Sequence, residues 1–126
     1  MATAEAPIHQ DIKEKIVSST ERDTTHIFRT LHNTARVYKN KIAEEVVRIE
    51  KRGNAKFEDV RDLVSGARGK RVYETGDPDA GIWTAGIVIG LIKDIPTCEV
   101  LLKNIEKDAE DIISRLQALK VDKAKL

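Results

Sequence analysis

The sequence predicts a mainly helical α+β fold with one short antiparallel β-hairpin. Two observations support this prediction. Apolar residues recur at intervals of three and four over several stretches, as they do along the buried face of an amphipathic helix. Only one stretch, residues 24–39, combines β-branched and aromatic residues with a central turn signal, as the two strands of a hairpin do.

The composition indicates a single globular domain. The chain has 126 residues, and 40% of them are hydrophobic, which is enough to build a core. Its 22 basic and 21 acidic side chains leave a net charge of +1, which provides no broad field to attract nucleic acid or an anionic membrane.

The single cysteine, Cys98, excludes an intramolecular disulfide. The N-terminus has no pattern of a secretory signal, and the apolar stretch from Gly81 to Ile92 is shorter than the roughly 20 residues of a membrane helix. These features predict a cytoplasmic protein.

The first part of the chain is predicted to hold a short helix followed by the hairpin. Isoleucines recur every four residues on one face of this helix, at Ile8, Ile12 and Ile16. Thr24–Leu31 and Thr34–Lys39 have the composition of two strands, and His32 and Asn33 between them can turn the chain. Because neither strand alternates cleanly between apolar and polar residues, a helix is the alternative for this stretch.

Two further helices are predicted after the hairpin. Asn40 can cap the first of them, and Gly53 follows its last turn, where glycine often ends a helix. The two apolar stripes are Ile42, Val46 and Ile49, and then Phe57, Val60 and Val64. Residues 65–69, which contain two glycines, are predicted to break or bend the second helix.

The most unusual feature is an almost wholly apolar segment, Ile82–Lys93, which follows a turn signal at 76–81. Trp83, Ile87 and Leu91 lie four residues apart, and this spacing predicts a helix. A helix that is apolar on all sides must be buried on all sides, and a domain this small can hardly hide it. We therefore expect a surface outside this chain to cover the segment.

The longest predicted helix begins near Pro96 and Thr97, two residues that suit a helix N-terminus. Its apolar residues recur at intervals of three and four: Leu101, Ile105, Ala109, Ile112, Leu116 and Leu119. Residues 121–126 are predicted to fray.

Residues of the types that support catalysis are few. His9, His26 and His32 have no second ligand type at a metal-binding interval, and Cys98 stands alone, so we expect no metal site. We interpret the histidines as surface or supporting residues. Gly66–Arg71 holds a G-x-x-G pattern followed by two basic residues, which is typical of a loop that clamps RNA. Because the flanking pattern of that motif is absent, we favour a basic bend and keep RNA binding as an alternative.

Six short motifs lie in order along the chain: Glu21–Thr24, Arg29–Arg36, Ser65–Arg68, Val72–Asp77, Ala80–Gly86 and Gly90–Thr97. Together they resemble the nitronate monooxygenase family, formerly called 2-nitropropane dioxygenases. Each motif is modest alone, but their order is specific, and the resemblance runs from Ala2 to Leu116.

The resemblance implies a flavin-binding (β/α)₈ TIM barrel accompanied by a smaller domain and a C-terminal helix, and this chain resembles the smaller part. The barrel would bind most of the FMN. The family's catalytic histidine has no counterpart here, so the chain alone is expected to be inactive. The implied substrate-side candidates are Trp83, Thr84, Ala85, Gly86 and Ile87. Many relatives carry glutamine where this chain has Ile87, so one hydrogen bond to flavin or substrate is expected to be missing.

The implied reaction is the oxidation of alkyl nitronates with FMN and dioxygen. The alternative reaction within the family is the transfer of hydride from NAD(P)H to a quinone, which relatives with similar motifs carry out. From other functional classes, a non-catalytic helical interaction module and a small RNA-binding protein stay open.

The resemblance also divides the chain into a junction after the barrel strands (1–20), a substrate-side domain (21–95) and a C-terminal helix with a frayed tail (96–126). The expected partners are a small-molecule substrate and a flavin barrel, supplied by a longer chain or by a separate subunit, with no membrane. Met1 is either a true start or an internal methionine of a longer chain.

Overall fold

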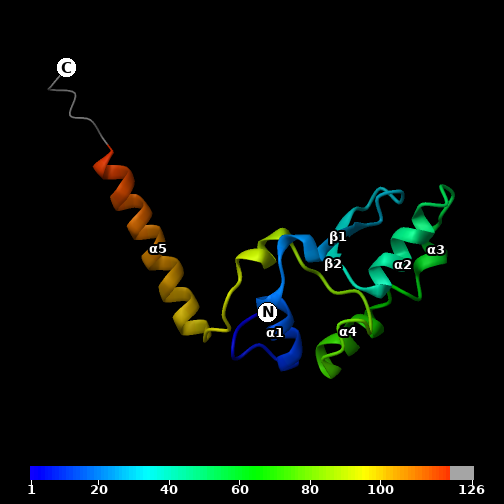
Figure 1. Ribbon diagram of the computed structural model, residues 1–126, viewed down its shortest axis with the longest axis horizontal. Coiled ribbons are helices and arrows are strands. Elements are labelled where there is room, and N and C mark those ends of the chain that lie inside the picture. The colour runs from blue at the N-terminus through cyan, green and yellow to red at the C-terminus, as the bar shows by residue number, and fades with distance from the viewer. Residues whose placement is uncertain (120–126) are drawn as a thin grey trace, which may run out of the picture. The chain divides into compact units, whose positions relative to one another are not determined.

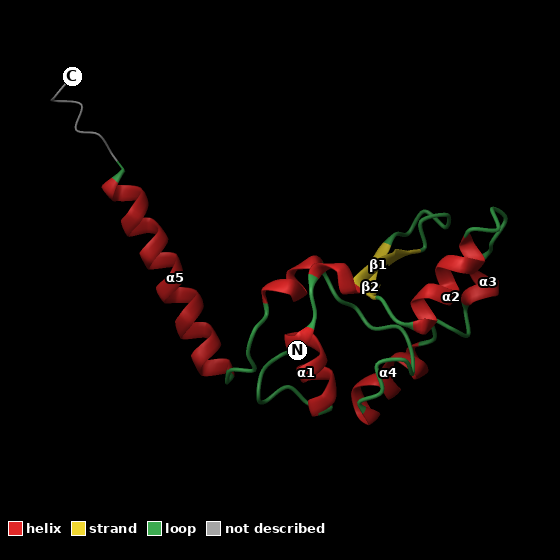
Figure 2. Ribbon diagram, viewed as in Figure 1, coloured by secondary structure: helices red, strands yellow, loops and turns green. Residues whose placement is uncertain are grey.

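The computed structural model describes residues 1–119, and the predicted frayed tail at 121–126 lies outside this range. The described residues are mainly helical and include a two-stranded antiparallel sheet, so the predicted fold class is confirmed (Figure 2). They form two compact units. The first consists of Met1–Ala2 with Ala6–Ile95, and the second of Thr3–Glu5 with the described residues from Pro96 onward.

The elements of the first unit follow one another along the chain (Figure 1): α1 (Gln10–Ser18), the 3₁₀ turn η1 (Glu21–Asp23), β1 (Thr24–Ile27), β2 (Ala35–Tyr38), α2 (Lys41–Glu50), α3 (Phe57–Val60), α4 (Gly66–Thr75) and the 3₁₀ turn η2 (Ile87–Leu91). Helix α2 contacts β1 and α3, and η2 contacts η1 and α1.

The predicted hairpin is present, with His26 opposite Arg36 and Ile27 opposite Ala35. Strand β1 ends at Ile27, four residues earlier than predicted, because Phe28 takes a left-handed conformation with a φ of 63°. The buried carboxylate of Glu50 in α2 then accepts hydrogen bonds from the amides of the loop. The loop is therefore shaped by a contact that is distant in sequence.

Helix α2 begins and ends where the sequence predicts. The Asn40 side chain accepts a hydrogen bond from the Ala43 amide at 2.8 Å, and Gly53 follows the helix with a φ of 83°. Ala43, Val46 and Ile49 form its buried face, which is turned by one residue from the predicted stripe.

Two hydrophobic clusters make up the core of the first unit. One joins α1, the end of β2, α4 and residues 83–89, through Ile12, Ile16, Tyr38, Val72, Trp83, Ala85 and Ile89. The other lies between the hairpin, α2 and α3, through Ile27, Val37, Ala43, Val46, Ile49 and Val60.

The prediction of a helix over Ile82–Lys93 is wrong. Residues 82–86 are extended, Thr84 forms an isolated antiparallel bridge with Val37, and a 3₁₀ turn follows at Ile87–Leu91. The physical reason is a competing period of two: Trp83 and Ala85 are buried, whereas Thr84 and Gly86 are exposed. The two glycines at 86 and 90 further lower the helical propensity.

The break predicted at residues 65–69 is present but lies slightly earlier: α3 ends at Val60, Ser65 is the extended N-cap of α4, and residues 66–69 form the first turn of α4. Gly69 and Gly81 allow close packing here. A Cβ on Gly69 would lie 2.9 Å from the Ile82 carbonyl oxygen, and a Cβ on Gly81 would clash with the Arg68 backbone. Helix α4 and the 81–82 segment therefore approach each other at backbone distance.

The second unit consists of α5 (Cys98–Ala118) and the short strip Thr3–Glu5. Thr97 caps the helix by accepting a hydrogen bond from the Val100 amide, and the Glu5 carboxylate accepts one from the Cys98 amide at 2.9 Å. The predicted apolar stripe is present on α5, and no residue of the helix is buried. None of the helices within residues 1–119 combines the length and apolarity that a membrane crossing requires.

Candidate substrate-side site

The extended segment from Trp83 to Ile87 is fixed to the hairpin by its backbone. The Tyr38 amide donates a hydrogen bond to the Trp83 carbonyl at 3.0 Å, and Thr84 pairs with Val37. This pairing adds a short third strand position beside β2, so side chains of the segment point alternately into and out of the core. Of the five predicted site residues, Trp83 and Ala85 therefore lie inside, and Thr84, Gly86 and Ile87 lie outside.

Trp83 holds the segment in place and is not available to a ligand from the exposed side. Its ring stacks on Tyr38, with 4.3 Å between ring centroids and 16° between planes, and only 2% of the residue is exposed. Its indole N–H donates to the Pro78 carbonyl at 3.2 Å. The Asn40 side-chain amide donates to the same carbonyl at 2.6 Å and to the Gly81 carbonyl at 2.8 Å. The cap of α2 thus also anchors the loop that delivers Trp83.

The outward residues open onto an apolar surface. Ile87 is 60% exposed, and the next exposed residues, Val88 and Leu91, belong to the same 3₁₀ turn. A Cβ added at Gly86 would meet nothing closer than a Val88 methyl at 3.9 Å, so the backbone here is open to a ligand or partner. Gly86, Ile87, Val88 and Leu91 therefore form an exposed, apolar and unobstructed face, and a face of this kind is suited to contact another molecule.

Tyr73 of α4 is a polar residue beside this segment that the sequence analysis did not single out. Partial burial raises the pKa of the Tyr73 phenol, and a hydrogen bond with the Thr84 backbone partly offsets the rise. Tyr73 is therefore a neutral hydroxyl at physiological pH. Its place within the motif Val72–Asp77 was the available signal, but nothing in the local pattern indicated contact with Thr84.

A small cavity of about 140 Å³ lies behind the segment, between Ile16, Trp83, Ala85 and Ile89. Ligand pockets are usually about 300–1,000 Å³, so an FMN ring system does not fit here. The glycines that could have cradled a phosphate are filled by protein: Gly81 by the Arg68 backbone and Gly90 by the Glu21 amide, 2.9 Å from its added Cβ. The segment from Trp83 to Ile87 and the cavity behind it therefore do not form an FMN site.

The other residues considered from sequence are not brought together. His9 caps α1 by accepting a hydrogen bond from the Asp11 amide at 3.3 Å, and it packs against Gly76. His32 lies exposed in the hairpin loop with a φ of 56°. Within residues 1–119 no three His, Cys, Asp or Glu side chains are placed to share a metal ion.

The G-x-x-G pattern at Gly66–Arg71 is the first part of helix α4 and not a loop. Lys70, its first basic residue, is paired with Glu74 at 3.4 Å. The geometry of an RNA-clamping loop is therefore absent at this position, and the pattern is explained by the packing of Gly69.

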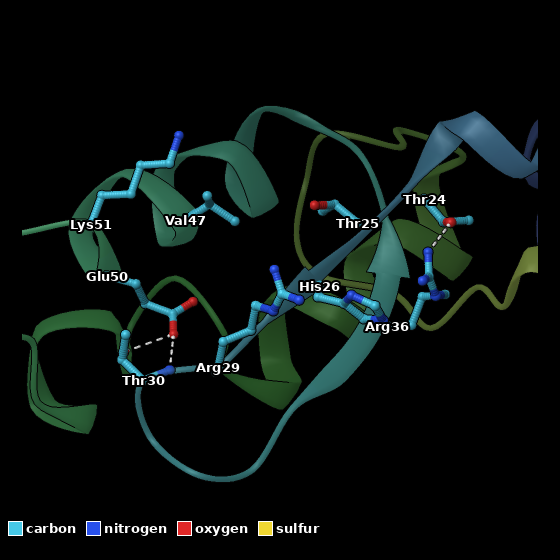
Figure 3. Close-up of a pocket in the computed structure, with 9 residues that line it drawn as sticks. All are labelled: Thr24, Thr25, His26, Arg29, Thr30, Arg36, Val47, Glu50 and Lys51. Carbon is cyan, nitrogen blue, oxygen red and sulfur yellow. Dashed lines mark hydrogen bonds between the residues drawn. The ribbon is translucent and has the colours of Figure 1, made fainter. Parts of the chain in front are cut away.

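A second hollow, which the sequence analysis missed, lies between β1, the hairpin loop and α2 (Figure 3). His26, Arg29 and Arg36 line it together with residues of α2. The signal in the sequence was weak, because Arg29 was assigned to a strand that in fact ends at Ile27.

Fold and site together define a mainly helical α+β unit with an exposed apolar segment beside the hairpin. No family model matches the chain. Among solved structures it is similar to FabK from Thermotoga maritima, with 25% sequence identity and a TM-score of 0.80, over 94% of this chain and 37% of that one. A point mutant of the same FabK matches at 24% identity and a TM-score of 0.75, over 94% of this chain and 34% of that one. The chain thus spans well under half the length of the proteins it matches.

Proposed function

We propose that this chain is the substrate-side part of a flavin-dependent oxidoreductase and that it works against a flavin-binding barrel. The main support is the similarity to FabK, which extends over 94% of the chain at a TM-score of 0.80. The flavin and the oxidoreductase chemistry in this proposal are inferred from the six ordered motifs, which resemble those of a flavoenzyme family.

In such an enzyme the FMN would supply the electron transfer, and this chain would bind and orient the substrate and keep water out. The buried pair Trp83 and Tyr38 would hold the segment rigid from behind. Thr84, Gly86 and Ile87 would face the substrate. A rigid support matters because a displacement of about 1 Å at a reacting group can cost about 100-fold in rate.

Oxidation of alkyl nitronates by dioxygen is the reaction we propose first, on the strength of the motifs. Hydride transfer from NAD(P)H to a quinone is the second candidate. Ile87 offers an apolar contact where many relatives of the motif family have glutamine. This favours a substrate that presents an alkyl chain or an apolar ring at that point.

The barrel would also cover apolar surface that the described residues leave open. In the first unit this surface is formed by Ile87, Val88 and Leu91, which are 60%, 57% and 79% exposed. In the second unit it is the stripe on α5, which includes Leu101, Ile105, Ile112 and Leu116. Contiguous apolar surfaces of this kind usually mark interaction sites.

A domain replacement tests the proposal. The part of Thermotoga maritima FabK that this chain matches is exchanged for residues 1–126, and the purified chimera is assayed for bound flavin by its visible absorbance. We expect a yellow protein that either consumes dioxygen and releases nitrite with an alkyl nitronate or oxidises NAD(P)H with a quinone. The two activities separate the two candidate reactions.

Two aspartate variants provide the control. Ile87→Asp places a charge on the proposed contact surface, and Phe57→Asp places one on an equally accessible apolar residue, 50% exposed, in α3. We expect the first variant to abolish turnover and the second to leave it unchanged. A chimera that folds and binds flavin but shows neither activity, or that responds equally to both variants, would refute the proposal.

A further inference from the structure

The hollow between β1, the hairpin loop and α2 has the size of a ligand site. Its volume is about 380 Å³, within the usual range of about 300–1,000 Å³ for small-molecule pockets. Its charged walls come from the hairpin and from the end of α2 (Figure 3). His26 lies on β1, Arg36 on β2 and Arg29 in the hairpin loop, whereas Glu50 is the last residue of α2 and Lys51 follows it.

The pocket is positively charged. His26 and Arg36 are directly opposite each other in the sheet, so their side chains share one face. Arg29, Arg36 and Lys51 carry permanent positive charges, and Glu50 carries the one negative charge. The Glu50 carboxylate is already bound, because it accepts hydrogen bonds from the Phe28 amide at 2.9 Å, the Thr30 amide at 3.1 Å and the Thr30 hydroxyl at 2.9 Å. Three cations against one anion leave a net charge of +2.

Donors in the pocket are left over for a ligand. Within residues 1–119, neither Arg29 nor Lys51 has an ion-pair or hydrogen-bond partner for its side chain, and the Thr25 hydroxyl has none either. Arg36 uses one nitrogen to donate to the Thr24 hydroxyl at 2.8 Å, which orients the guanidinium and leaves its other N–H groups available. In the view of Figure 3 the Arg29 side chain extends between Glu50 and His26.

His26 responds to the same positive surroundings. Partial burial lowers the pKa of its imidazole, and the charges of Arg36 and Arg29 lower it further. An anion in the pocket would reverse the electrostatic part of this shift. Binding would then take up a proton at His26, so affinity would rise as the pH falls toward the free imidazole's pKa.

We propose that this pocket binds the phosphate group of a phosphorylated small molecule. A phosphate monoester carries a charge of about −1.5 to −2 at neutral pH and has three terminal oxygens. That charge matches the net +2 of the pocket, and the oxygens match donors on separate walls. A carboxylate has one charge and two oxygens and would leave donors unmatched. The residues that line the pocket include no phenylalanine, tyrosine or tryptophan on which a base could stack, and this disfavours a single-stranded nucleic acid.

The test is an NMR titration of the full 126-residue chain with phenyl phosphate, and with inorganic phosphate and benzoate as comparison ligands at matched ionic strength. Both phosphates should shift resonances of β1, the hairpin loop and the end of α2, and benzoate should bind at least about tenfold more weakly. The pKa of His26, read from its ring protons, should rise when phenyl phosphate is bound.

Arg29→Gln is the informative variant, because its guanidinium has no bond in the fold to lose. Arg61→Gln, an exposed arginine after α3 that does not line the pocket, is its matched control. Loss of one charge-assisted contact should weaken phenyl phosphate binding about tenfold in Arg29→Gln and leave it unchanged in Arg61→Gln.

Three results would overturn the proposal. One is the absence of shifts in the pocket with either phosphate. Another is equal binding of benzoate and phenyl phosphate, which would make the pocket a general anion site. The third is tight binding of a short RNA that is lost in Arg29→Gln, since the partner would then be a nucleic acid. The proposal does not depend on the flavoenzyme assignment, and neither does its test.

Discussion

Glu50 is the side chain on which the hairpin loop depends. Only 6% of the residue is exposed, and its carboxylate accepts hydrogen bonds from the backbone amides of Phe28, which has the left-handed conformation, and of Thr30. A left-handed conformation is unfavourable for a bulky residue such as phenylalanine, so the surrounding structure must hold it. Glu50 provides that hold, and it also shapes one wall of the basic pocket.

We expect Glu50→Gln to lower the free energy of unfolding by about 1–3 kcal/mol, because the new amide group would face two backbone donors and leave one unpaired. Glu44→Gln, an exposed position on the same helix, should have a much smaller effect. Urea unfolding at pH 7 measures both. Equal effects of the two variants would show that the loop is held by something else.

Asp23 links stability to pH at the start of β1. Its carboxylate accepts hydrogen bonds from the Thr20 amide at 2.8 Å and the Thr20 hydroxyl at 3.0 Å, and these bonds lower the pKa of Asp23 below its usual value. A lowered folded-state pKa means that the contribution is fully present above the unfolded-state pKa of about 3.9 and is lost as the pH falls through the folded-state value.

Asp23→Ala should therefore destabilise the protein by about 1 kcal/mol at pH 7, the usual cost when alanine replaces a capping side chain. The difference from the unmodified chain should shrink as the pH falls from about 4 through the lower folded-state pKa, where the natural aspartate becomes protonated. Urea unfolding of both proteins, from pH 7 down to below about 4, measures the difference in the free energy of unfolding. A difference that stays constant with pH would contradict the assignment.

At the scale of the elements, the segment from Gly81 to Ile87 was the hardest to predict. Its apolar residues fit a period of four as well as a period of two, and local sequence does not choose between them. Tertiary contacts select the extended form. The backbone of Trp83 and Thr84 pairs with the edge of β2, and α4 lies against Gly81. The elements with local signals were predicted correctly, namely the hairpin, the Asn40 cap, the Gly53 terminus and the Thr97 cap.

The close approach of α4 and Gly81 can be tested with two alanine substitutions. Gly81→Ala would drive a Cβ into the Arg68 backbone, so we expect a loss of at least about 2 kcal/mol in the free energy of unfolding, of the order of an overpacked core. Gly66→Ala, in the first turn of α4, has open space around the new Cβ and should be neutral or slightly stabilising. Thermal unfolding of both variants measures the contrast. Tolerance of Gly81→Ala would mean that the two backbones are not in contact.

At the scale of the whole molecule, we expected the apolar segment Ile82–Lys93 to leave surface uncovered. Part of it does, but in an extended stretch and a 3₁₀ turn and not in the predicted helix. Trp83, Ala85 and Ile89 are enclosed by the chain's own core, but Ile87, Val88 and Leu91 are not. The sequence could show that the segment was too apolar to be hidden, because that follows from composition. It could not show which residues would face outward, because that depends on the extended backbone. The basic pocket was missed for a similar reason, since it depends on where β1 ends.

The exposed apolar stripe on α5 leads to a prediction about self-association. We expect the isolated chain to self-associate at high concentration, because a helix with an open apolar stripe gains by burying it. The double substitution Ile112→Glu with Leu116→Glu should reduce the self-association, whereas Glu106→Asp with Asp108→Glu on the same helix should not. Sedimentation velocity over a range of concentrations distinguishes these outcomes. A chain that stays monomeric throughout would argue against an unsatisfied interface.

The central claim is that the flavin belongs to a barrel outside the described residues and that this chain supplies only the substrate side. The most direct measurement is the visible absorbance of the purified chain after incubation with excess FMN and removal of the free cofactor. The account predicts a colourless protein, because the cavity behind Trp83 is about 140 Å³ and the nearby glycines are filled by backbone. FMN held only by its phosphate group in the basic pocket is expected to be removed together with the free cofactor. A yellow protein with one FMN per chain would contradict it.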